Sequence, residues 1–92
     1  MNSILLLHGG SLNQGMWAQQ AEALKVEFDV HVLDLPGHGQ NIKKPFTLET
    51  AIDEVHKYIT SKIKGNTTIV GLSLGGYVAI AMHINTPRMF LN

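Results

Sequence analysis

Three short apolar runs, each followed by a turn or loop, alternate with segments of helical periodicity. The runs lie at residues 4–7, 30–33 and 67–70. The first is continuously apolar rather than alternating, which is typical of a strand covered on both faces. Runs of this length separated by helical segments are the pattern of βαβ units, whose strands form a parallel sheet. The sequence therefore predicts an α/β fold, with three strands and three helices in three α/β/α layers.

Each expected helix carries its own signals. In the first, residues 14–26, apolar residues recur three or four positions apart after Asn13, a suitable N-cap. The second begins after Thr47 and ends before Gly65, which we place at the C′ position. The third, residues 75–85, is apolar nearly all round, so it requires burial in a larger core. The stripes of the first two comprise Trp17, Ala21, Leu24 and Phe28, then Leu48, Ile52, Val55, Ile59 and Ile63. The stretch Gln40 to Phe46 is expected to be a loop.

Composition excludes several classes of function. Basic and acidic residues number seven each among 92 residues, so no basic surface is available to bind nucleic acid. There is no cysteine, which excludes disulfides and thiolate metal sites. The run at residues 4–7 is too short for a signal peptide or a membrane span. We therefore expect a soluble, cytoplasmic protein with no nucleic-acid or membrane partner.

The strongest chemical signal is the segment Gly71–Gly75, which reads G-x-S-x-G between an expected strand and an expected helix. A nucleophilic serine requires a strained turn that lifts its Oγ clear of the sheet, and the flanking glycines leave room for that turn. The N-terminus of the following helix directs unpaired N–H groups at a developing oxyanion. The pattern favours Ser73 as a nucleophile, the alternative being an ordinary turn of small residues.

A second signal is His8-Gly9-Gly10, which directly follows the first strand. On its own, such a turn is usually structural, with the imidazole bonded to nearby backbone. Because ligands of open α/β sheets bind at the carboxyl ends of the strands, this turn and the serine turn are expected at one edge. Together they favour two halves of an oxyanion hole.

These two motifs and the turn Asp34–Gly39 resemble, in order and spacing, the N-terminal part of α/β-hydrolases. The closest resemblance is to compact bacterial esterases and C–C-bond hydrolases, and it covers essentially all of residues 1–92. It implies a partial α/β-hydrolase fold whose C-terminal half is absent, with strands 30–33 and 67–70 on opposite sides of strand 4–7.

The resemblance also implies roles for single residues. Ser73 would be the nucleophile, and the backbone N–H groups of Leu74 and Gly10 would form the oxyanion hole. Asp34 and the range 37–39 would be mainly structural, with His38 a loop residue. The remaining motif positions are His8, Gly9, Gly71, Gly75 and Gly76. Asn41 stands where the family often has Ser or Thr, a minor departure.

The catalytic triad cannot be completed from this sequence. In this fold the acid and the histidine follow the serine along the chain, yet no Asp or Glu follows Ser73. The only later histidine is His83, which at 1.5 Å per residue lies about 15 Å along the same helix. Asp34 ends a strand at the correct edge, but no free base accompanies it. We therefore expect a truncated chain that is inactive alone.

Two functions from different classes remain. The first is a serine hydrolase that acts on an ester, a thioester or a C–C bond next to a carbonyl, with a small-molecule substrate and no metal or organic cofactor. The second is a non-catalytic module that binds or self-associates through the unpaired edge of strand 67–70. A dinucleotide-binding unit is strongly disfavoured, because Ile42 stands where the third glycine of its fingerprint should be.

Overall fold

The computed structural model describes residues 2–85, with the backbone alone at positions 84 and 85. Its elements are β1 (Ser3–Leu7), the 3₁₀ helix η1 (Gln14–Trp17), α1 (Ala18–Leu24), β2 (Asp29–Leu33), the 3₁₀ helix η2 (Gly39–Asn41), α2 (Leu48–Lys62), β3 (Thr67–Gly71) and α3 (Leu74–Asn85). The strands form one parallel sheet in the order β2-β1-β3. The predicted α/β class and strand order are thus confirmed.

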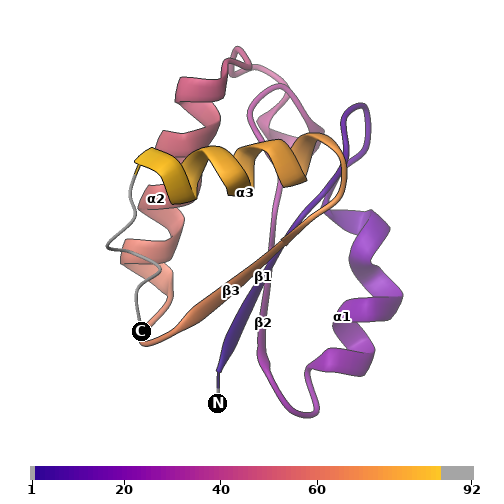
Figure 1. Cartoon of the computed structure of the whole chain (residues 1–92). Helices are drawn as coiled ribbons and strands as arrows, with labels where there is room; N and C mark the ends of the chain where they lie inside the picture. The colour runs from indigo at the N-terminus through magenta and orange to yellow at the C-terminus, as the bar shows by residue number, and fades with distance from the viewer. Residues whose placement is uncertain (1, 86–92) are drawn as a thin grey trace.

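The central strand β1 organises the sheet. All five of its residues are buried, and its middle residue Leu5 lies opposite His31 of β2 and Ile69 of β3. Leu5 and Leu7 belong to the core formed with α2 and α3. Helix α1 lies on the other side of the sheet (Figure 1) and packs against β2. The layers are therefore helix, sheet, helix.

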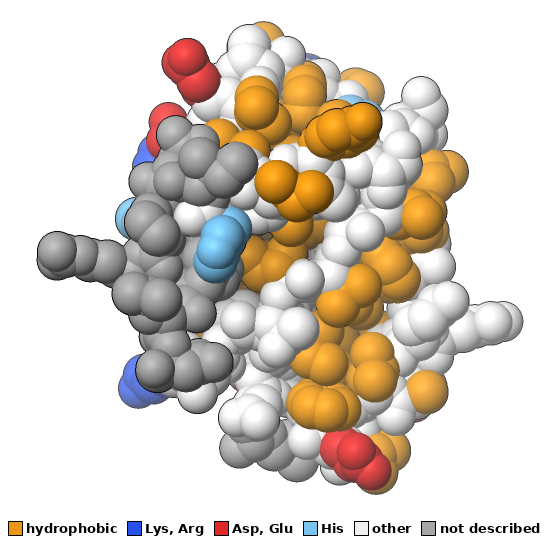
Figure 2. Space-filling model, viewed as in Figure 1, with side chains coloured by type: hydrophobic (Ala, Val, Ile, Leu, Met, Phe, Trp, Pro, Cys, Tyr) orange, Lys and Arg blue, Asp and Glu red, His pale blue; other side chains and the backbone are white. Residues whose placement is uncertain are grey.

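The main core lies between the sheet and the pair α2 and α3. Its buried members are Leu5, Leu7, Leu35, Ala51, Val55, Ile59, Ile63, Val78 and Met82. Helix α3 contributes only part of its apolar surface, because Tyr77 is 72% and Ile80 62% exposed. Figure 2 shows hydrophobic side chains gathered on the face that α3 and β3 turn toward the viewer. The sequence of α3, apolar nearly all round, predicts that the helix is buried, and in the structure this burial is incomplete.

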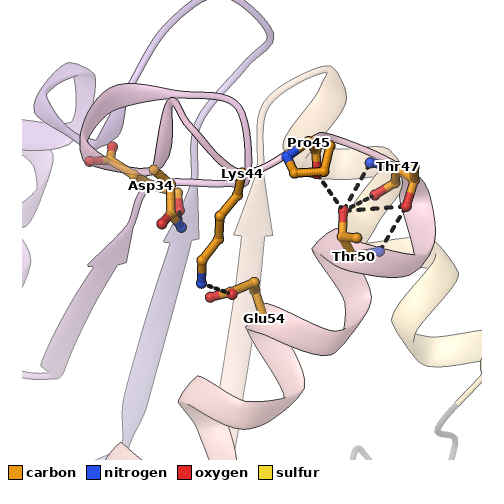
Figure 3. Close-up of polar contacts among 7 residues, drawn as sticks. Asp34, Lys44, Pro45, Thr47, Thr50 and Glu54 are labelled. Atoms are coloured by element: carbon orange, nitrogen blue, oxygen red, sulfur yellow. Dashed lines mark hydrogen bonds and ion pairs between the residues drawn. The ribbon is translucent and has the colours of Figure 1, made fainter.

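The start of α2 is fixed by side chains at both ends of its first turn. The Thr47 hydroxyl accepts a hydrogen bond from the Thr50 backbone N–H at 3.0 Å, and the Thr47 N–H donates to the Thr50 hydroxyl at 2.9 Å. The Thr50 hydroxyl also donates to the Pro45 carbonyl at 3.0 Å. Lys44 forms an ion pair with Glu54 one turn along the helix (Figure 3). The predicted cap at Thr47 is confirmed, and it also ties the preceding loop to α2.

Several predicted details of the helices were wrong. The predicted N-cap Asn13 is confirmed, since its side chain accepts from the Gly15 N–H at 2.8 Å, but the segment that it caps begins as a 3₁₀ helix, and α1 ends at Leu24 rather than at residue 26. Leu48 is 47% exposed because it opens α2, and Ala51 takes the buried position in that turn. Helix α2 ends in extended backbone at residue 63, so Gly65 lies at C″ rather than C′, though its φ of 83° still favours glycine.

The expected loop at residues 40–46 overlaps the short helix η2. Helix α3 begins one residue earlier than predicted, at Leu74. Within the described part of the chain, no helix is long and apolar enough to cross a membrane.

Candidate functional site

Ser73 occupies the sharp turn between β3 and α3. Its φ is 52°, a left-handed conformation that costs a non-glycine residue about 1–2 kcal/mol. Its side chain is exposed, and its hydroxyl forms no hydrogen bond with the described residues. The strained, exposed serine that the G-x-S-x-G pattern predicts is therefore present. Such strain persists only where the surrounding structure imposes it.

The glycines around Ser73 impose that conformation. A Cβ on Gly71 would lie 2.3 Å from the backbone carbon of Gly75, and one on Gly75 would lie 2.3 Å from the Leu7 carbonyl oxygen. Gly76 is less restricted, with its Cβ position 3.3 Å from the Gly71 oxygen. The Leu72 N–H donates to the same Leu7 carbonyl at 3.1 Å. The turn therefore packs directly against the end of β1, and Gly71 and Gly75 stand at positions that leave no room for a side chain.

The two expected oxyanion donors lie on adjoining segments. A Cβ on Gly10 would lie 3.8 Å from the Leu74 Cβ, and one on Gly9 would lie 3.5 Å from the Leu72 carbonyl oxygen. Among the described residues, neither the Gly10 N–H nor the Leu74 N–H donates a hydrogen bond. Two unpaired backbone donors therefore flank the exposed serine, as an oxyanion hole requires.

Both ring nitrogens of His8 form hydrogen bonds that stabilise the turn after β1. Its ring is fully buried, and its Nε2 lies 3.0 Å from the Leu35 backbone nitrogen. Because that N–H can only donate, Nε2 accepts and the ring proton lies on Nδ1, which donates to the Gly9 carbonyl at 2.8 Å. The neighbouring His38 lies with its Nδ1 2.9 Å from the Pro36 carbonyl. His8 therefore joins the turn after β1 to the turn after β2.

Asp34 anchors the turn after β2. Its Oδ1 accepts from the Gln14 N–H at 2.8 Å, and its Oδ2 accepts from the Gln14 side chain at 3.0 Å and the Gln40 N–H at 3.1 Å. The Asn41 side chain donates to the Asp34 carbonyl at 3.0 Å. Gly39, with φ 52°, is required here because a Cβ would lie 2.4 Å from the Asp34 Cγ.

Both carboxylate oxygens of Asp34 are therefore occupied, which supports its structural role. Burial raises the pKa of this carboxyl, but the donors on Gln14 and Gln40 outweigh burial, and the pKa lies below its ordinary value. The sequence alone did not indicate Gln14 and Gln40 as hydrogen-bond partners of Asp34. The only signal for such partners is the glycine turn itself, which brings backbone N–H groups toward the end of β2.

A second polar cluster lies at the end of the sheet where the strands begin, opposite to the end that carries Ser73. The Asp29 Oδ2 lies 2.8 Å from the His31 Nε2 and accepts from the Ser3 hydroxyl at 3.2 Å, while the His31 Nδ1 lies 2.8 Å from the Tyr58 hydroxyl. The bond with His31 lowers the pKa of Asp29, and burial, with the Asp29 charge, raises that of Tyr58. Asp29 and Ser3 begin their strands, whereas Ser73 follows the end of β3. This cluster therefore lies away from the serine.

The described residues place no acid–base pair beside Ser73. His8 is occupied, and His83 lies exposed on α3. Within residues 2–85, no three His, Asp or Glu side chains are grouped to hold a metal ion. A cavity of about 190 Å³ lies between the loop at Pro45 and α2, and Ser73 does not line it. The site thus combines an exposed serine with two unpaired backbone N–H groups.

The chain is similar to known proteins along most of its length. The chain is 33% identical over 85 residues to pimeloyl-[acyl-carrier protein] methyl ester esterase of Nitrosomonas europaea, covering 92% of this chain and 32% of the relative. It is 35% identical over 82 residues to the enzyme of that name from Vibrio cholerae, covering 89% and 31%. The similarity covers only the N-terminal 30–40% of such relatives.

Solved structures share the same arrangement. An N-acyl homoserine lactone degrading enzyme superposes with a TM-score of 0.90 at 26% identity, covering 98% of this chain and 36% of that one. The enol-lactonase of Burkholderia xenovorans gives 0.84 at 27%, covering 97% and 35%. The model of the alpha/beta hydrolase family matches residues 4–90. The chain belongs to the alpha/beta hydrolase family.

Proposed function

We propose that Ser73 is the nucleophile of a serine hydrolase for carboxylic esters, and that residues 1–92 do not turn over substrate on their own. The observation that carries the proposal is the exposed serine at φ 52° beside the unpaired N–H groups of Gly10 and Leu74. The similar proteins described above are named for a methyl ester and for lactones, which are cyclic esters. These names favour a carboxylic ester over a thioester or a C–C bond.

The proposed reaction uses Ser73 and the two unpaired backbone N–H groups. The Ser73 Oγ attacks the ester carbonyl carbon, and its proton passes to an imidazole base that the described residues do not supply. The carbonyl oxygen becomes an oxyanion, which the N–H groups of Leu74 and Gly10 stabilise. The carbon–oxygen bond of the ester breaks, the alcohol leaves with the proton, and water hydrolyses the acyl-enzyme. One such donor is typically worth about 10²–10³-fold in rate.

A fluorophosphonate probe tests the proposal, because it reacts covalently only with an activated serine. We expect no labelling of the 92-residue chain. A fusion of this chain to the remaining C-terminal part of the Vibrio cholerae relative should label, and the same fusion with Ser73→Ala should not. Rapid, Ser73-dependent labelling of the short chain would show that it contains its own base. Absence of labelling in a folded fusion would exclude Ser73 as the nucleophile.

A second candidate is a non-catalytic module that assembles through β3. The exposed apolar side chains of Val70 and Leu72 at the end of this strand favour it. Size-exclusion chromatography with light scattering separates the candidates, since a monodisperse monomer at all concentrations would exclude assembly of the chain with itself.

A further inference from the structure

The turn after β1 contains a second serine with left-handed backbone. Ser11 has φ 63°, and its exposed side chain forms no hydrogen bond with the described residues that would offset the strain. The Leu12 N–H donates to the Gly9 carbonyl at 3.2 Å and closes a four-residue turn in which Ser11 is third. A positive φ at this position favours glycine. Strain of this kind is found at functional sites, yet the proposed reaction uses neither Ser11 nor Leu12.

This turn brings the side chain of Leu12 against that of Leu72. A Cβ on Gly9 would lie 3.4 Å from the Leu12 Cδ1 and 3.6 Å from the Leu72 Cδ2, so both side chains reach the same point over Gly9. Gly9 is buried, whereas the two leucines are 44% and 45% exposed. The two turns that carry them lie at the same end of the sheet (Figure 1). We call Leu12 and Leu72 the leucine pair.

The leucine pair adjoins the proposed reaction centre on both sides. Leu72 directly precedes Ser73, and Leu12 follows Gly10 by two residues. An ester whose carbonyl is held by the Gly10 and Leu74 N–H groups therefore has an exposed apolar surface beside it. Ligand sites combine such apolar surface with a few polar groups that fix the orientation of the ligand.

We infer that the leucine pair binds the alkyl chain of the ester, and that Ser11 is a positioning residue that holds Leu12 in the pair. The inference rests on the proposed function, because the alkyl chain meets the pair only when the carbonyl lies at Ser73. Burial of apolar surface contributes up to about fourfold in affinity for each methylene group. The chain belongs either to the acyl or to the alcohol part of the ester, and the experiment distinguishes these two sources.

Ester hydrolysis by the fusion to the C-terminal part of the Vibrio cholerae relative tests the inference. Leu12→Asn and Leu72→Asn should each raise KM at least fivefold for either methyl octanoate or octyl acetate, with kcat and the rate on methyl acetate changed less than twofold. A raised KM for methyl octanoate assigns the acyl chain to the pair, and one for octyl acetate assigns the alcohol chain. Leu48→Asn is the matched control, because Leu48 is 47% exposed at the start of α2. Equal effects of all three variants, or none on either long ester, would overturn the inference.

Two substitutions of Ser11 test its positioning role. Glycine adopts a positive φ freely, so Ser11→Gly should keep the preference for the long ester. A β-branched residue opposes this conformation, so Ser11→Val should raise KM for the long ester as Leu12→Asn does. The same KM for both variants would contradict the role. A loss of kcat on methyl acetate with Ser11→Val would assign Ser11 to the Gly10 donor instead of Leu12.

Binding to the 92-residue chain provides a measurement that requires neither the fusion nor catalysis. In methyl-resolved NMR spectra, the long ester should shift the methyl signals of the leucine pair and leave those of Leu48 unchanged. Leu12→Asn should weaken this binding at least fivefold. Shifts confined to Val70 and Ile80, which are exposed on β3 and α3, would place the ester elsewhere and overturn the inference.

The inference and the proposed function fail in different ways. Methyl shifts at the leucine pair without fluorophosphonate labelling of the folded fusion would refute the proposed function alone. Labelling of the fusion without an effect of the leucine variants on the long esters would refute the inference alone. Shifts in the 92-residue chain that vanish in the fusion would show that the added polypeptide covers the pair, which also overturns the inference.

Discussion

Asp34 shows how one carboxylate can position a turn next to a candidate site. It receives three hydrogen bonds, from Gln14 before α1 and from Gln40 in the loop after β2. Its side chain is nearly buried, so these donors are the groups that balance its charge. The turn that they stabilise also carries Leu35, whose N–H donates to His8. A change at Asp34 is therefore expected to reach the turn that carries Gly10.

The lowered pKa of Asp34 predicts a specific acid sensitivity. A carboxyl with a lower pKa in the folded than in the unfolded state stabilises the fold above its ordinary pKa of 3.8 and loses that contribution as the pH falls through its folded pKa. We expect Asp34→Asn to lower the free energy of unfolding at pH 7 by about 1–3 kcal/mol, because one amide N–H would face a donor. Between pH 7 and pH 3 the variant should lose less stability than the unaltered chain.

Urea denaturation at a series of pH values measures both effects. Asp53→Asn is the control, since Asp53 is an exposed carboxylate on α2, and it should retain the unaltered pH profile. An identical acid slope for Asp34→Asn and the unaltered chain would contradict the assignment.

Single residues were predictable from sequence where the constraint is local. Ser73 follows from the glycines on either side, because a Cβ on Gly71 would meet the Gly75 backbone only four residues along the chain. The bond between Gln14 and Asp34 joins positions 20 apart. It depends on how η1 docks against the sheet, which no spacing within either segment specifies. His31 and Tyr58 are paired across 27 residues in the same way.

At the scale of elements, α1 and α2 differ in their capping and in the burial of their side chains. Helix α2 has a reciprocal cap and three buried residues, whereas α1 has no side-chain cap of its own and none of its residues is fully buried. The apolar stripe predicted for α1 does lie toward the sheet, since Ala21 and Leu24 are half-buried. Its packing is thus shallow.

Shallow packing predicts that α1 opens more readily than α2. Native-state hydrogen exchange should show the amides of α1 exchanging through local opening, while β1 and the middle of α2 exchange only through global unfolding. Mass spectrometry of peptides from the 92-residue chain makes this measurement. Equal protection of α1 and α2 would show that α1 is held by more than the contacts with β2 and η1.

Element boundaries were predictable to different degrees. The strands were located to within one residue because apolar runs and glycine turns define them. The end of α2 was misplaced because Gly65 has a left-handed φ whether it stands at C′ or C″, so its presence does not specify which. Leu48 fits the apolar stripe of α2, but a stripe cannot show that the first turn of a helix extends beyond the core.

At the scale of the whole molecule, the sheet has one central strand and two edges. Only β1 is buried along its full length, and β3 alternates half-buried and exposed residues. The strand order was predictable only through the resemblance to a known family, since periodicity alone does not order parallel strands. Sequence likewise did not reveal the polar cluster that distinguishes the β2 edge.

The open β3 edge predicts concentration-dependent association of the short chain. Val70→Lys should reduce light scattering at high concentration, because a charge on an edge strand opposes pairing with another strand. Its free energy of unfolding should change by no more than about 0.5 kcal/mol, as for other surface positions. Val26→Lys adds the same charge far from β3 and should scatter as the unaltered chain does. Equal suppression by both variants would indicate a general effect of net charge.

The close packing of the Ser73 turn against the end of β1 has a consequence for protein engineering. The Leu7 carbonyl receives the Leu72 N–H and lies where a Gly75 side chain would be, and the next residues along that strand lead to Gly10. Ser73 and the proposed oxyanion donors, Gly10 and Leu74, therefore adjoin the same stretch of backbone, so fluctuations of the outer helices should move them together. A protein engineer could therefore vary the polypeptide that covers this stretch of backbone without changing how Ser73 is aligned with the two N–H groups.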